Sequence, residues 1–210
     1  MKLKPALLVL SALLLSSCKQ EIEPYDVHKI TRSNTTIDCK GGQFNSGKST
    51  EIRVISDVKN VTIKNCKLKG SIRIYGLGMN GEDEEVKKSS HKKGHTSRAQ
   101  KAAPSNVLIS NMIIEGVQRI PVYLSPGVTK TTIENSKFIG TTDSSVIYLD
   151  AESAYNTIRN NSFNVSGNFT LRQFRIREVI AVDGSAHNTI SGNSFQRAIG
   201  GGIYLYRNCG

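Results

Sequence analysis

A short pattern recurs about every 25 residues, and it constrains the possible folds of this chain more than any other feature. Six segments end in an isoleucine that follows Thr or Leu, and successive isoleucines lie 26, 46, 24, 25 and 32 residues apart. A period of this size is typical of a solenoid, in which each repeat buries its apolar face against its neighbours. The six isoleucines are Ile37, Ile63, Ile109, Ile133, Ile158 and Ile190.

Two further apolar runs accompany these segments. In five repeats an apolar residue follows the isoleucine five places later, and a second alternating run lies between the repeats. Alternation of period two with Val and Ile is typical of short, half-buried strands, so we predict coils of three strands each. The first set is Leu68, Ile114, Phe138, Phe163 and Phe195, and the second set is 53–54, 72–74, 122–124, 147–149, 180–182 and 203–205.

Three strings carry a resemblance to a known family: Asn-Val-Thr-Ile-Lys-Asn-Cys-Lys-Leu at 60–68, Asn-Thr-Ile-Ser-Gly-Asn-Ser-Phe at 188–195, and Gly-Ile-Tyr-Leu at 202–205. In these strings the chain resembles the right-handed parallel β-helix proteins of the pectate-lyase-like superfamily. The resemblance implies an all-β fold, a right-handed parallel β-helix of about six or seven coils over residues 30–210. It implies little about a reaction, because this fold carries lyases, hydrolases, epimerases, adhesins and tailspikes. The Asn-Thr-Asp, Asp-Asp and Gly-His-Gly signatures of its polygalacturonase branch are missing from the sequence.

The N-terminus has the features of a targeting signal rather than of part of the fold. Residues 1–17 combine Lys2 and Lys4 with an apolar run too short to span a bilayer, as in a secretory signal peptide. The run ends in Leu-Ser-Ser-Cys at 15–18, which resembles the lipobox of bacterial lipoproteins and implies a lipid on Cys18. We expect residues 18–29 to be a tether. Because Lys19, and not Asp, follows the cysteine, the outer membrane is the favoured location within the cell envelope.

The charge of the chain favours acidic partners. The formal net charge is +11, and it becomes +9 without the two lysines of the signal peptide (11 − 2). A basic balance in an envelope protein points to an anionic polysaccharide or to phosphate groups, whereas nucleic acid is the least expected partner there.

Two stretches interrupt the repeat. Residues 77–105 hold acidic residues followed by lysines, with His91 and His95, and we interpret them as an exposed, mobile insertion between two strands of one coil. Residues 168–176 add a loop beside a strand over 178–183. The chain stops directly after a strand without a visible cap, so we expect either further coils or a covering chain in the natural protein.

The three cysteines outside the lipobox leave two interpretations open. Cys39 and Cys66 fall on adjacent coils, one residue out of register, and coils stack about 4.8 Å apart. In the oxidising envelope a disulfide is within reach of this pair. The alternative, which we favour, is that two small residues fill an interior row.

Side chains that point out of the predicted helix form a column rich in Tyr and Arg. Tyrosine faces stack on sugar rings, and arginine binds carboxylate or sulfate in a fork. We therefore predict a sugar chain along this face, contacted by Arg53, Arg73, Tyr123, Tyr148, Tyr204 and Arg177. The alternative is that the stacked tyrosines only extend the packing of the ladder.

Asp150 and Asp183 take the same position on successive coils and are the predicted catalytic pair. Carboxylates about 5 Å apart cannot both ionise cheaply, so either one keeps a proton or a cation lies between them. The first case suits a glycosidase, and the second suits a lyase with Ca²⁺, to which Glu152 could add a ligand. The alternative is that each aspartate caps its own turn. The sequence thus predicts a protein that binds and possibly cleaves polysaccharide, or else a non-catalytic surface module or a fragment of a larger β-helix protein.

Overall fold

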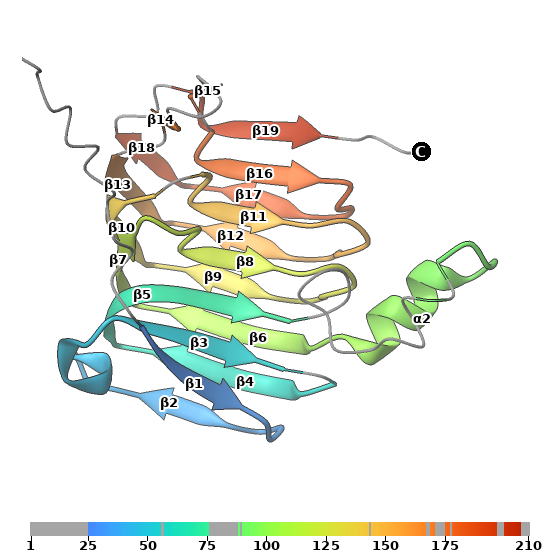
Figure 1. Ribbon diagram of the computed structural model, residues 1–210, viewed down its shortest axis with the longest axis horizontal. Helices are drawn as coiled ribbons and strands as arrows, with labels where there is room; N and C mark the ends of the chain where they lie inside the picture. Colours follow the sequence, from blue (N-terminus) through green and yellow to red (C-terminus); the bar gives the residue numbers. More distant parts are fainter. Residues whose placement is uncertain are drawn as a thin grey trace, which may run out of the picture.

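The computed structural model describes residues 25–55, 57–75, 88, 90–142, 144–166, 169–170, 175–176, 178–196 and 200–206. Parallel strands wind through them into a stack of coils with three faces (Figure 1). Each face is a sheet made of one strand from each successive coil, as the period of the sequence predicts. The fold is therefore all-β and a parallel β-helix.

The three sheets are named here A, B and C. Sheet A contains β1 (Asp26–Ile30), β3 (Thr50–Val54), the second half of β5 (Lys67–Ile74), β8 (Val122–Leu124), β11 (Ile147–Leu149), β16 (Ile180–Asp183) and β19 (Ile203–Tyr206). Sheet B contains β2 (Thr36–Asp38), β4 (Lys59–Lys64), β6 (Ser105–Ser110), β9 (Thr132–Glu134), β12 (Thr157–Arg159) and β17 (Thr189–Ser191). Sheet C contains the first half of β5 with β7 (Ile113–Val117), β10 (Lys137–Thr141), β13 (Ser162–Ser166) and β18 (Ser194–Gln196).

The register of the ladders confirms the alignment of the repeats. In sheet B the six repeat isoleucines pair coil by coil, for example Ile63 with Ile109 and Ile133 with Ile158. In sheet C Phe163 lies between two other phenylalanines, with ring centroids 4.8 and 5.2 Å away. These side chains fill the interior, where stacking of like residues removes apolar surface from water at every coil.

Asparagines form the corners between the sheets. Asn34, Asn60 and Asn106 all have φ near +58°, a left-handed conformation that Asn tolerates better than most residues. Their side chains also bond to one another, Asn60 to Asn34 at 2.9 Å and Asn106 to Asn60 at 2.7 Å. At the next corner the buried Asn161 accepts the N–H of Ser136 and donates to the carbonyl of Ile133. Asparagine therefore sets the turn and ties neighbouring coils together.

The structure contains the disulfide between Cys39 and Cys66, with Cα atoms 4.8 Å apart. Our favoured interpretation, two unbonded small residues, is therefore wrong. The offset of one residue in register does not prevent the bond, because the strand ends at this corner and the chain turns there. The bond joins the first two coils of sheet B.

One boundary differs from the sequence interpretation. The β-helix begins at Asp26 rather than at residue 30, because β1 pairs in parallel with β3 across residues expected to be tether. The polar composition of this segment hides the strand, since four of its five residues are exposed.

The interpretation of 77–105 as an exposed, mobile insertion does not hold for its last part. That part forms α2 (His95–Ala102), in which Ala99 is 0% exposed. The helix packs on the turns that follow β8 and β11, and Gln100 donates to the carbonyl of Glu152 at 2.9 Å.

The second interruption forms the short antiparallel pair β14 (Phe169–Thr170) and β15 (Arg175–Ile176). A single turn of 3-10 helix, η1 (Phe44–Gly47), precedes β3. Throughout the described ranges, no helix reaches the length and hydropathy required to cross a bilayer.

Candidate functional site

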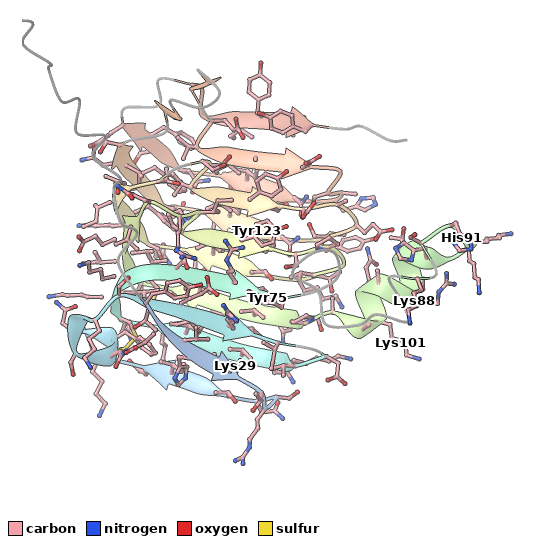
Figure 2. All side chains as sticks on the ribbon, in the orientation of Figure 1. Lys29, Tyr75, Lys88, His91, Lys101 and Tyr123 are labelled. Carbon is pink, nitrogen blue, oxygen red and sulfur yellow. A yellow bond between two sulfur atoms is a disulfide. The ribbon has the colours of Figure 1, made fainter. Side chains whose placement is uncertain are left out.

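The outer face of sheet A gathers the predicted binding residues. Arg53, Arg73, Tyr123, Tyr148, Ala181 and Tyr204 occupy consecutive positions of one column, as their pairing partners show. Lys29 continues the column onto β1, because it pairs with Arg53. Lys29, Tyr75 and Tyr123 can be followed along this face in Figure 2. The column thus runs from cationic residues on the first coils to tyrosines on the later ones.

A buried carboxylate organises the cationic end of the column. Glu51 is 2% exposed and accepts hydrogen bonds from Nε of Arg53 at 2.5 Å and from Nε of Arg73 at 3.1 Å. Nη1 of Arg119 lies 3.8 Å from the same carboxylate. Three guanidinium groups thus share one anion, which leaves a surplus of two positive charges (3 − 1). All three arginines remain partly exposed, so this surplus charge reaches solvent.

Each guanidinium also lies over a tyrosine ring. Arg119 is 3.9 Å from the ring centre of Tyr25, and Arg73 is 5.1 Å from that of Tyr123. Cation–π contact of this kind holds a guanidinium flat on the ring and fixes the direction of its N–H groups. The three arginines are thereby oriented before any ligand arrives.

The middle of the column is a tyrosine ladder. The rings of Tyr123 and Tyr148 stack with centroids 5.5 Å apart. The hydroxyl of Tyr123 donates a hydrogen bond to Asp150, and the hydroxyl of Tyr148 donates one to Asp183. Burial, together with the bond to Asp150 and its charge, raises the pKa of Tyr123 well above its usual range. The phenol therefore stays protonated at neutral pH.

The two predicted catalytic aspartates do lie on adjacent coils: Asp150 directly follows β11, and Asp183 is the last residue of β16, which pairs with β11. Both are engaged within the fold. One oxygen of Asp150 accepts the N–H of Ala151 at 2.7 Å, so this side chain caps its turn as the alternative interpretation holds, while the other accepts from Tyr123. Asp183 is 3% exposed. Among the described residues no group of three or more His, Cys, Asp or Glu could hold a metal ion, so no Ca²⁺ site involving Glu152 is evident there.

Further predicted residues lie in different settings. Tyr204 is 54% exposed on β19 and stacks at a tilt with Tyr206, whose ring centroid is 5.4 Å away. Arg177 and the predicted lipidation site Cys18 lie outside the described residues.

Sequence reasoning missed four residues of this face. The alternation of side chains along β3 could have revealed Glu51. It lies two residues before Arg53, so both side chains point to the same face of the sheet. The buried Glu178 accepts from Ser145 and from Tyr206, each at 2.7 Å. No repeat signal marks Tyr25 or Arg119, because Tyr25 precedes the first strand and Arg119 lies in a turn.

The comparison with family models agrees with this architecture. The model described as the right-handed beta helix region matches residues 16–210. The chain belongs to the right-handed β-helix family. A search of the curated proteins gave no significant match, and a search of the solved structures gave none either. In this right-handed β-helix protein the candidate functional residues lie on the outer face of sheet A and on the turns beside it.

Proposed function

We propose that this β-helix is a lipid-anchored protein of the bacterial cell envelope that binds an acidic polysaccharide along the outer face of sheet A. β-Helix proteins are often carbohydrate-related. The observation that carries the proposal is the surplus of positive charge around Glu51, on a face that continues directly into stacked tyrosines.

The charge supports an acidic ligand. The guanidinium group can bind a carboxylate or sulfate through two parallel N–H bonds, and Glu51 uses only part of the donors of the three arginines. Lys29, in register with Arg53, adds a further exposed cation. A uronate or a sulfated sugar would neutralise this patch, whereas a neutral sugar would leave the charges unpaired.

The tyrosine ladder supports a polymer rather than a single acid. Tyr123 and Tyr148 present their partly exposed side chains on the coils next to the charged patch, and Tyr204 follows beyond Ala181. The spacing between coils is about 4.8 Å, close to the length of one sugar ring. A chain laid along the column would therefore meet an aromatic or cationic side chain at nearly every ring.

The N-terminal segment supports the anchor, since two acyl chains hold a protein stably on a membrane. Replacement of the lipobox cysteine, Cys18→Ser, should release the protein from the membrane fraction and remove the acyl mass from the mature N-terminus. Retention in the membrane fraction would argue against the anchor while leaving the binding face untouched.

The binding proposal is tested with the full-length protein in detergent. Polygalacturonate should bind and dextran, a neutral polymer, should not, and the affinity should fall steeply with added salt. Tyr148→Ala should weaken binding about tenfold, whereas Tyr148→Phe should keep it within about threefold, because the ring survives. Arg159→Gln is the matched control for charge, since Arg159 pairs with Glu134 on sheet B and away from this face. Equal binding of the two polymers, or equal loss in the control, would refute the proposal.

Cleavage is a second candidate function, favoured by the pairing of a protonated phenol with a carboxylate on two successive coils. As the glycosidic C–O bond breaks, the phenol could give its proton to the leaving oxygen. The water that adds to the sugar carbon could then return a proton to the phenolate. Asp150→Asn combined with Asp183→Asn should then abolish the release of reducing ends from bound polymer. If the unaltered protein releases none, the protein is a binding module.

A further inference from the structure

A cavity lies away from the column, between α2 and the turns that follow β11 and β16. Its volume is about 570 Å³, within the range of small-molecule sites. Thr96 and Gln100 line it from the helix, and Glu152, Tyr155 and His187 line it from the turns. The remaining wall is formed by small residues such as Ala186, which leave the space open. The helix and the coils thus enclose the cavity together.

The wall of this cavity differs in charge from the rest of the protein. Glu152 is its carboxylate, and none of the described residues that line it is Lys or Arg, although the chain as a whole carries a net charge of +11. Lys88, His91 and Lys101, on α2 and the segment before it, lie beside the coil stack (Figure 2) and do not line the cavity. The cavity is therefore acidic within a basic protein.

The carboxylate of Glu152 is held in place by α2. One oxygen accepts the hydroxyl of Thr96 at 3.1 Å, and the other lies 3.2 Å from Nε2 of His95. Glu152 itself has φ +62°, a conformation that a residue with a side chain keeps only where its surroundings impose it. Its direction is thus fixed before a ligand binds.

The carboxylate of Glu152 can accept more bonds than α2 gives it. A carboxylate has about four acceptor sites in all, and the contacts with Thr96 and His95 use two of them. The remaining sites can accept hydrogen bonds from a ligand.

An aromatic pair completes the wall. The rings of Tyr155 and His187 are nearly parallel, at 8°, with centroids 4.8 Å apart, and Tyr155 is 54% exposed. At the same corner the earlier coils carry the bonded asparagines Asn34, Asn60 and Asn106, and the next coil carries Lys130. The exposed rings take this position only on the coils that form the cavity.

From these features we infer that the cavity is a binding site for a single amino-sugar ring. The ammonium group of the sugar would pair with Glu152, its hydroxyls would meet Thr96 and Gln100, and its apolar face would contact the aromatic pair. This site goes beyond the polymer-binding face and takes a ligand of the opposite charge. Either proposal can fail without the other, because one is tested with polygalacturonate and the other with single sugars.

The test is saturation-transfer NMR on the full-length protein in detergent, with glucosamine, N-acetylglucosamine and glucuronate as probes at up to about 20 mM. We expect glucosamine to bind about tenfold more tightly than glucuronate. Glu152→Gln should weaken glucosamine about tenfold and leave N-acetylglucosamine within about twofold, which also shows that the cavity persists. Glu134→Gln, a carboxylate change on sheet B, is the matched control.

Ala186→Trp fills the cavity without removing a polar contact, and it should abolish the binding of both glucosamine and N-acetylglucosamine. Saturation transfer that survives this variant would place the ligand elsewhere and overturn the inference. So would equal binding of glucuronate, the loss of both amino sugars in Glu152→Gln, or the lack of transfer to any probe in the folded protein.

Discussion

Tyr123 donates a hydrogen bond to Asp150, which lies on the next coil of the helix. The same relation recurs one coil later between Tyr148 and Asp183. Each pair joins residues more than 25 positions apart in sequence and ties two coils across the outer face. The middle of this face therefore holds two phenol–carboxylate pairs, which bond successive coils to one another.

The alkaline titration of Tyr123 tests this pairing. Because its pKa is raised above the value in the unfolded chain, the protonated phenol stabilises the fold below about pH 10. That contribution is lost as the pH rises toward the folded pKa. The ultraviolet titration of the seven tyrosines should show a late component that Tyr123→Phe removes. An identical titration in the variant would contradict the pairing.

Replacement of Glu51 should change stability and binding in opposite directions. Glu51→Gln removes the one anion shared by three arginines, which should cost about 2 kcal/mol in the free energy of unfolding, since these arginines are partly exposed. The surplus charge of the patch rises from two to three, so the folded variant should bind polygalacturonate more tightly. Urea denaturation and binding at two salt concentrations measure both effects, and weaker binding by the folded variant would argue against an acidic ligand.

Gly70 should be irreplaceable at the bend of β5, where the strand passes from sheet C to sheet A. It has φ +133°, and an added Cβ would lie 2.0 Å from the carbonyl oxygen of Thr50. Gly70→Ala should therefore lower the free energy of unfolding by about 3 kcal/mol or more. Gly41→Ala is the matched control, because Gly41 also has positive φ but has no atom within 4 Å of the added Cβ. Gly41→Ala should lower the free energy of unfolding by only about 1 kcal/mol. Equal losses of stability in the two variants would show that the positive φ, and not the contact with Thr50, determines the effect.

Loss of the disulfide should destabilise the first coils. The bond between Cys39 and Cys66 closes a loop of 27 residues, for which chain entropy predicts about 3 to 4 kcal/mol. The double variant Cys39→Ala, Cys66→Ala should unfold at lower urea concentration and should no longer respond to a reducing agent. If reductant leaves the unaltered protein unchanged, the bond contributes little to stability.

The sequence predicts the ladders well, because a solenoid converts a period along the chain into neighbours in space. Once Ile63 and Ile109 are aligned, the pairing of Leu68 with Ile114, five residues later on another face, follows. The pairing of Arg73 with Tyr123 follows from the alignment of the second apolar run. The same logic predicts that Asp150 and Asp183 lie on adjacent coils, and the pairing of β11 with β16 confirms it.

Contacts outside the repeat cannot be found in this way. Arg119 reaches Glu51 from a turn, and α2 reaches Glu152 from an insertion, and no period links either pair. Both contacts depend on turn geometry and on side-chain direction, which alternation does not encode. The disulfide could be predicted only in part. The repeat places Cys39 and Cys66 on adjacent coils, but it does not predict the direction of the chain at the corner, which brings the two sulfur atoms together.

β5 and β6 keep their pairing with the neighbouring coils, although 30 residues (75 to 104) separate Ile74 from Ser105 in the sequence. Foreign segments such as an epitope or a fluorescent reporter could accordingly be grafted at this junction, upstream of α2, while the rest of the scaffold keeps its shape. The molecule thus offers a ready-made display platform on which cargo and ligand-binding surfaces can be engineered separately.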